Sequence, residues 1–321
     1  MNEYTPQGPQ YDDEIDLFEL FQTVWDGKWS IIATTVIAAV AAIGISLQMP
    51  NIYVVESKIA PVESDQGGGL GGLMAQYGGL ASLAGIQLPS GGGGGQTELL
   101  VEVMQSRAFV NALIAKYDLA PRLMAMERYD PVTQTEYLDP NIYDIQNNTW
   151  LRVVEPPRQP EPSDQELYEA FAGAFTVEQD ATSPLTVVSF EHMSPKLGAE
   201  IVQLMIAEID DYARTKDRTE SQNSIEFLER KLTETQLVEI EKVMYQMIES
   251  QTKTLMLAEV NENYAFQVID PPFIPEVKAK PKRSLIVVLA TLVGGMIGVL
   301  FVLIRSAVRN RKQREGLESA G

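Results

Sequence analysis

The chain has 321 residues, with 44 acidic against 25 basic side chains, a formal net charge of −19 and no cysteine. A chain this acidic repels phosphate backbones, which argues against nucleic acid as a partner, and the lack of cysteine excludes disulfides and thiolate metal sites. The length allows about two domains.

Residues 1–29 are expected to form a cytoplasmic segment that contains a short amphipathic helix. Apolar side chains recur with helical spacing at Ile15, Phe18, Phe21 and Trp25. A helix with one apolar stripe can lie in the interface of a membrane. We therefore expect this helix to precede a membrane span.

Residues 30–49 are expected to form the first transmembrane helix. They carry no charged side chain, and a helix of about 20 residues crosses a hydrocarbon core about 30 Å thick. The alternative is a cleaved signal peptide. It is disfavoured because signal peptides begin with basic residues and have a shorter apolar run, whereas this chain begins with acidic residues.

Residues 284–304 are expected to form the second transmembrane helix, since they also carry no charge. A buried helix of a soluble core is the alternative, and the lack of a polar face disfavours it. Two spans place both termini on one side of the membrane and residues 50–283 on the other. The tail, residues 305–321, is basic, which favours cytoplasmic termini and a periplasmic domain.

The periplasmic domain is expected to begin with an α/β base, residues 51–213. Runs rich in β-branched and aromatic residues predict strands, and apolar residues at helical spacing predict helices. Pro195 follows Ser194 in the arrangement that opens a helix. In chain order we expect a strand over 51–62, a helix over 98–119, a helix over 164–174, a strand over 185–193 and a helix from Pro195.

A glycine-rich loop, residues 67–95, interrupts this base. Gly67, Gly69 and Gly72 satisfy the spacing GxGxxG, but in low-complexity sequence such a match arises by chance. A flexible loop is the first interpretation. The alternative is a loop that packs on neighbouring subunits or on the membrane, because apolar residues are interleaved with the glycines.

A helical extension, residues 214–263, is expected to follow the base. No proline or glycine occurs from Ala199 to Asp270, and the strand expected at 264–270 must return towards the second span. A hairpin of two helices that turns near 238–252 satisfies both conditions. Apolar spacing from Leu237 to Thr254 is heptad-like with a stutter, which predicts coiled-coil-like packing.

The returning segment, residues 264–283, ends in a proline-rich, basic junction before the second span. Pro271, Pro272 and Pro275 interrupt regular structure, and Pro281 and Lys282 lead into the span.

Within the second span, Gly294 and Gly298 form a GxxxG motif. Two small residues four apart let another helix approach closely. Glycines are also common in membrane helices without such a role, and that remains the alternative.

The order of these segments resembles the polysaccharide co-polymerases, the Wzz-type chain-length determinant proteins. The resemblance covers nearly the whole chain and rests on "DEIDLFELFQTVWDGKW", "VVSFEHMSPKLGAEIV", "VIDPPFIP" and "GGMIG". The family carries the element SPK before its second span. Lys280, Pro281 and Lys282 stand there in this chain, so a role that depends on the serine does not carry over.

The resemblance implies an α+β fold, with two transmembrane helices flanking an extracytoplasmic α/β base and an extended helical hairpin. It implies a homo-oligomer of the bacterial inner membrane that regulates the chain length of a polymerase-made surface polysaccharide, with lipopolysaccharide O-antigen as the expected product. The expected partners are the membrane polysaccharide polymerase, lipid-linked polysaccharide and the lipid bilayer. A scaffold for capsule or exopolysaccharide export is the alternative within the same family.

No residues of this chain are expected to act in catalysis or to bind a cofactor or metal. The GxxxxGK[ST] loop of the kinase domains that related proteins carry is missing. His192 is the lone histidine, and a surface position is favoured over a catalytic base. Asp210 and Asp211 are interpreted as a solvated helix face. We therefore predict a protein that is not an enzyme; a periplasmic glycan hydrolase or transferase is the disfavoured alternative.

Overall fold

The computed structural model describes residues 17–62, 94–179, 183, 185–234 and 237–318. The chain divides into two compact units, and each is described by itself. Unit 1 comprises residues 1–50 and 280–321, and unit 2 comprises residues 51–279. The glycine-rich stretch up to residue 93 and the first residues of the predicted amphipathic helix lie outside the described residues.

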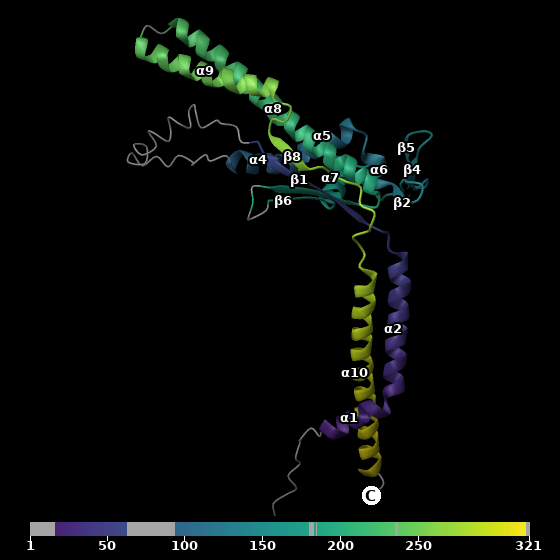
Figure 1. Cartoon of the computed structure of the whole chain (residues 1–321). Coiled ribbons are helices and arrows are strands. Elements are labelled where there is room, and N and C mark those ends of the chain that lie inside the picture. Colours follow the sequence, from purple (N-terminus) through teal and green to yellow (C-terminus); the bar gives the residue numbers. More distant parts are fainter. Residues whose placement is uncertain (1–16, 63–93, 180–182, 184, 235–236, 319–321) are drawn as a thin grey trace, which may run out of the picture. The chain divides into compact units, whose positions relative to one another are not determined.

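The described residues of unit 1 form the helices α1 (Leu17–Asp26), α2 (Lys28–Gln48) and α10 (Arg283–Glu318). Helices α2 and α10 pack side by side (Figure 1). Residues 28–48 and 283–309 are long and apolar enough to cross a membrane, so the two predicted apolar helices are present. Helix α10 continues beyond residue 304, the predicted end of the second span, to Glu318.

The core of unit 2 is an antiparallel sheet with the strand order β6-β7-β1-β8. Strand β1 lies in the middle and pairs Val55 with Phe190 of β7 and Ile59 with Val268 of β8. Alternate residues of β1, from Tyr53 to Ile59, are buried on one face, as the period of a half-buried strand requires. The strands are β1 (Tyr53–Pro61), β6 (Phe175–Gln179), β7 (Thr186–His192) and β8 (Phe266–Asp270).

One face of this sheet is covered by helices. Helix α8 (Pro195–Glu234) lies against β1 and β7, and α4 and α5 pack around it. The side chains between these layers form one apolar core that includes Phe171, Phe190 and Met205. The core explains why the predicted strands at 51–62 and 185–193 belong together: each supplies every second residue to it.

The helix predicted over 98–119 is instead two helices, α4 (Gly94–Gln105) and α5 (Arg107–Lys116). Ser106 separates them. Its backbone is extended (φ −71°, ψ 145°), and its hydroxyl accepts a hydrogen bond from the N–H of Phe109 at 3.3 Å. A serine that caps a new helix competes with helix continuation, so one capping side chain divides the apolar pattern into two elements.

Residues 120–163, for which the sequence indicated no regular element, contain a short helix and two small hairpins. The elements are α6 (Ala120–Met124), β2 (Met126–Asp130) with β3 (Thr135–Leu138), and β4 (Tyr143–Asp144) with β5 (Thr149–Trp150). Carboxylates of Asp130 and Asp144 accept backbone N–H bonds inside the turns. Helix α7 (Asp164–Ala172) then starts at a capping box formed by Ser163 and Glu166.

Helices α8 and α9 (Val238–Val260) form an antiparallel hairpin (Figure 1). The predicted turn at 238–252 is wrong, because α9 runs through that whole interval. Helix α8 ends at Glu234, and Leu237 has an extended backbone (φ −98°, ψ 113°). The heptad-like stripe is also shifted: Met244 and Gln251 are partly buried, whereas Ile240 and Met247 are 42% and 40% exposed.

Candidate functional site

The GxxxG motif of α10 faces α2 of the same chain. A Cβ atom built on Gly294 would lie 2.5 Å from Cβ of Ala38 and 3.5 Å from the carbonyl oxygen of Thr34. A Cβ atom on Gly298 would overlap the hydroxyl of Thr34 and lie 3.1 Å from Cα of Ile31. Both glycines therefore permit a close approach that no larger residue allows. The structure brings these two predicted site residues into one contact.

A third close contact, at Gly27, was not predicted from the sequence. A Cβ atom there would overlap the side chain of Val302 on α10. Gly27 lies between α1 and α2, and its backbone carbonyl accepts hydrogen bonds from the N–H groups of Ser30 and Ile31. A glycine at a helix start beside an apolar span is the signal that could have found it.

Three threonine hydroxyls in the paired helices donate to carbonyls of their own helix. The Thr34 hydroxyl donates to the carbonyls of Ser30 (3.1 Å) and Ile31 (2.9 Å), and Thr35 donates to Ile31 at 2.7 Å. On α10, the Thr291 hydroxyl donates to Val287 at 2.7 Å. At these positions close packing holds the pair together, and at the end of α2 the Arg283 guanidinium of α10 donates to the carbonyl of Met49 at 3.4 Å.

The predicted proline-rich and basic junction is divided between the two units. In unit 2 the backbone N–H of Ala279 donates to the carbonyl of Ile52 at 2.9 Å, so both chain connections of the unit lie side by side. In unit 1 the carbonyl of Lys282 accepts from the N–H groups of Leu285 and Ile286, which starts α10. The lysine acts there as a helix cap, and its side chain is not needed for that role.

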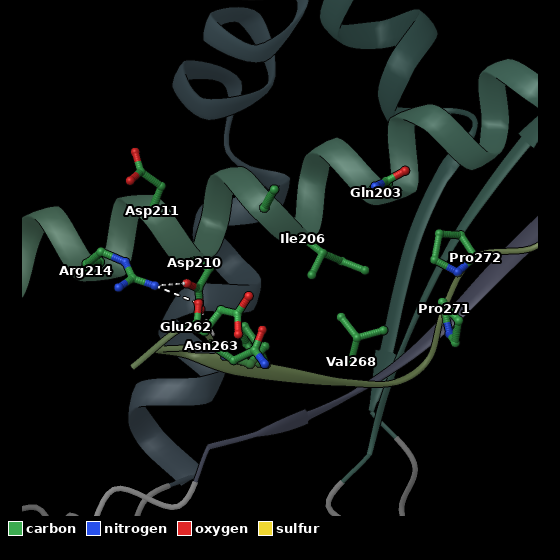
Figure 2. A pocket seen from close by; sticks show the side chains of 12 residues that line it. Gln203, Ile206, Asp210, Asp211, Arg214, Glu262, Asn263, Val268, Pro271 and Pro272 are labelled. Carbon is green, nitrogen blue, oxygen red and sulfur yellow. Dashed lines mark hydrogen bonds and ion pairs between the residues drawn. The ribbon is translucent and has the colours of Figure 1, made fainter. Parts of the chain in front are cut away.

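Pro271 and Pro272 line an open groove between α8 and β8, with a volume of about 520 Å³ (Figure 2). Helix α8 contributes Gln203, Ile206 and Asp211, and β8 contributes Val268. These two prolines therefore share a surface, whereas the other predicted junction residues, Pro275, Pro281 and Lys282, do not line it.

A buried polar network lies at the start of α8. The Ser194 hydroxyl donates to Oε1 of Glu136 at 2.6 Å and accepts from the N–H of Leu197 at 3.1 Å. Arg122 donates to both carboxylate oxygens of Glu136, at 2.8 and 3.0 Å, and to Glu200 at 2.8 Å. Burial acts to raise the pKa of Glu136, but the hydrogen bonds from Arg122 and Ser194 outweigh it and lower the pKa.

His192 belongs to the same network and is partly buried, so its predicted surface position is wrong. Its Nδ1 atom accepts a hydrogen bond from the backbone N–H of Ser194 at 3.1 Å. Burial lowers its pKa to about 4, against the opposing charge of Glu136. Because the Ser194 hydroxyl donates to a carboxylate and not to His192, the geometry caps a helix and does not activate a nucleophile.

Metal ligands do not gather within the described residues: no group of three His, Cys, Asp or Glu side chains could hold an ion there.

The architecture defines a membrane protein with two spans that flank an α+β domain. Family models agree with this class. The model of the Wzz chain length determinant proteins matches residues 13–117. The model of GNVR, a G-rich domain described on a tyrosine kinase, matches residues 231–307.

Two solved structures with similarity to the chain carry related descriptions. One is a full-length bacterial polysaccharide co-polymerase, 18% identical, with a TM-score of 0.40, and the match covers 92% of this chain and 99% of that one. The other is a fragment of WzzB, a polysaccharide co-polymerase from Salmonella Typhimurium, 13% identical, with a TM-score of 0.30 and coverage of 72% and 100%. A comparison with curated protein sequences gives no significant match.

The two family models support the resemblance to the Wzz-type polysaccharide co-polymerase family of chain length determinants, with a Wzz match over residues 13–117 and a GNVR match over residues 231–307. Proteins of this family regulate chain length and are not catalysts, and they act with polysaccharide assembly machinery. The resemblance found in the sequence is thereby confirmed.

Proposed function

We propose that this chain sets the length of lipopolysaccharide O-antigen while a membrane polymerase extends it. The observation that carries the proposal is the pair of family models, which together include both apolar helices and the tip of the helical hairpin. In the proposed arrangement the protein lies in the bacterial inner membrane, with cytoplasmic termini and residues 50–283 in the periplasm. The basic residues that follow the second span support this orientation.

Several copies are proposed to assemble into one scaffold around the polymerase or the lipid-linked glycan. Support comes from an apolar stripe on α9 that stays exposed among the residues that the structure describes. Ile240, Val243 and Met247 follow one another at spacings of three and four residues and are 42%, 54% and 40% exposed. Exposed apolar side chains on one helix face are typical of surfaces that bind another protein.

The polymerase is proposed to contact the outer face of α10. The groove at Gly294 and Gly298 is already occupied by α2. A helix of the polymerase would therefore have to pack on another face of α10. A shallow apolar groove lies there, lined among others by Thr291, Leu292 and Gly295. Among the described residues, the Thr35 hydroxyl is the one atom within 4 Å of a Cβ atom built on Gly295, at 3.6 Å, so this position leaves room for a partner in the bilayer.

A deletion strain tests the function. On a gel of extracted lipopolysaccharide, we expect the deletion strain to show a broad distribution of O-antigen lengths with no preferred length. Re-expression of the chain should restore the preferred length. The second candidate, a scaffold for capsule or exopolysaccharide export, predicts a loss of that polymer with an unaltered O-antigen profile. An unaltered profile of every surface polysaccharide contradicts both.

A further inference from the structure

The root of the α8–α9 hairpin carries a clasp of two charged residues. Asp210 and Arg214 lie one turn apart on α8 and form an ion pair of 2.9 Å, with side chains that are 15% and 26% exposed (Figure 2). The sequence predicts a solvated face for Asp210. That prediction is wrong, because the side chain accepts backbone hydrogen bonds that only a returning chain can supply.

Each partner of the clasp holds a different part of the returning chain. Oδ1 of Asp210 accepts from the backbone N–H groups of Tyr264 at 2.9 Å and Ala265 at 2.7 Å, immediately before β8. Arg214 donates to the carbonyls of Ala258 (2.9 Å), Asn261 (2.7 Å) and Glu262 (2.9 Å) at the end of α9. The two residues of this ion pair thus hydrogen-bond to three backbone carbonyls and two backbone N–H groups of the returning chain.

A second contact extends the clasp one turn further along α8. The Tyr264 hydroxyl donates to Oδ2 of Asp217 at 2.6 Å, and the guanidinium of Arg214 lies 5.8 Å from the centre of the Tyr264 ring. Burial, followed by the hydrogen bond to Asp217, raises the pKa of Tyr264, so the hydroxyl remains a donor. Asp210, Arg214 and Asp217 occupy one face of α8, which turns a polar stretch into a specific docking surface for the returning chain.

Few apolar side chains are fully buried along the rest of the hairpin, and others, such as Ile225 of α8 and Ile248 and Leu255 of α9, are partly buried. Within the side chains described for α9, Ala258 alone is buried, and it lies at the clasp itself. On the outer part of α8, Leu228 is the buried apolar residue. Because so few apolar side chains of the two helices are fully buried, the directed hydrogen bonds of the charged root are the strongest available restraint on the position of α9 along α8.

We propose that the Asp210–Arg214 clasp fixes the register of α9 against α8 and thereby narrows the distribution of polysaccharide lengths. This inference rests on the proposed function, since it assigns the control of length to the geometry of the hairpin. Asp210 and Arg214 are positioning residues in it: they touch neither glycan nor polymerase, and they act through the exposed stripe that α9 presents.

The experiment uses the full chain, which contains no cysteine, so spin labels can be placed at will. Labels at Lys58→Cys on β1 and Lys253→Cys on α9 report the position of the hairpin against the sheet by pulsed electron resonance, with labelled protein diluted in unlabelled chain. We expect Arg214→Gln to broaden the distance distribution and to widen the spread of O-antigen lengths at unchanged abundance. Arg214→Lys keeps the charge but not the fork of donors, so its effect should be intermediate.

The matched control is Arg218→Gln. Arg218 pairs with Glu259 at 3.8 Å on the same hairpin, but both side chains are more than half exposed, and such pairs contribute little. It should leave both measurements unchanged. Distances in Arg214→Gln that match those of the original chain overturn the proposal, and so does a broadened distance distribution with an unaltered length distribution. If the deletion strain keeps its polysaccharide lengths, the proposed function is wrong, and so is the proposed control of length by the clasp. The measured distances still decide whether the clasp fixes the register of α9 against α8.

If Arg214→Gln lowers abundance, Asp210→Asn replaces it in both measurements. Its amide oxygen still accepts the N–H groups before β8, but the ion pair is gone. The same two outcomes then support or overturn the proposal.

Discussion

Gly298 of α10 lies directly against Thr34 of α2, so that a single added methyl group at position 298 would overlap the threonine hydroxyl. The GxxxG motif is thus occupied within the chain. Gly294 also packs against α2, whereas its neighbour Gly295 has space beside it. We therefore expect a bulky substitution to disturb the helix pair at Gly294 but not at Gly295.

Replacing Gly294 and Gly298 with leucine should force α2 and α10 apart. Overpacking a tight contact costs about 1–3 kcal/mol, while leucine still favours insertion into the bilayer. We expect normal protein levels and a lost or shifted preferred O-antigen length, read from immunoblots and lipopolysaccharide gels.

Gly295→Leu is the control for this pair, because α2 leaves space beside Gly295. It should retain the α2–α10 contact, measured as cross-linking between cysteines introduced into α2 and α10 in the presence of each leucine substitution. Equal cross-linking in the Gly294→Leu/Gly298→Leu double variant and in Gly295→Leu would show that the motif does not hold the spans together. A length change in Gly295→Leu alone would favour the proposed polymerase contact on the outer face.

The proposed orientation is tested with reporters that are active only in the cytoplasm. Fused at Gly321, such a reporter should give full signal, because the basic tail favours the cytoplasm. Inserted at Gln146, in the exposed turn between β4 and β5, it should give none. The reverse pattern contradicts the orientation, and a reporter of periplasmic location at the same two sites provides the complementary control.

Changing Ile240, Val243 and Met247 to serine should weaken assembly of the chain. The three side chains are exposed, so their removal costs the isolated fold little, whereas an interface would lose its apolar contacts. We expect a smaller particle mass in detergent for the triple variant. Glu249→Ser, at an exposed position on the opposite face of the same helix, should retain the original mass, and an unchanged mass in the triple variant excludes the stripe from the interface.

Protonation of His192 should destabilise the domain in mild acid. The pKa of the buried ring is lowered from 6.5 to about 4, so the unfolded chain binds the proton first as pH falls. The free energy of unfolding should therefore decrease as the pH falls below about 6.5. The total decrease by pH 4 should be at most about 3 kcal/mol. Glu136 and Arg122 face the ring. The pKa of Glu136 is also lowered. The stability that its ionised carboxylate contributes is therefore lost only when the pH falls below the ordinary pKa of a glutamate, at the acid end of this window.

Denaturant titrations of the full chain at several pH values measure this effect. His192→Gln should flatten the dependence between pH 6.5 and 4.5, since glutamine does not titrate. A dependence of the same slope in the variant would assign the effect to other groups.

Long apolar patterns were predictable from the sequence, and so were the strands that feed the core. Residues 30–49 and 284–304 have no competing structure available, and Val55 and Phe190 lie in segments with strand composition. The divided helix was not predictable, because Ser106 interrupts an apolar pattern that continues on both sides. Its effect depends on one hydrogen bond to Phe109.

The site was less accessible to sequence reasoning than the fold. Gly294 and Gly298 indicated a close helix contact but not its partner, which is set by Thr34 and Ala38 far away in the chain. Asp210 was predicted to lie on a solvent-exposed helix face because its partners, Tyr264 and Ala265, are also distant in the chain. A carboxylate on a polar helix face gives no sign that the backbone of a distant segment will return to it.

The internal hydrogen bonds of Thr34 have a consequence for the order in which the protein is made. During synthesis α2 reaches the bilayer long before α10, and it must stay there alone until the intervening domain has been completed. Because the Thr34 and Thr35 hydroxyls are satisfied by carbonyls of their own helix, these two side chains expose no unpaired donor to lipid while the helix waits. Its late partner then closes a contact that was never needed for insertion.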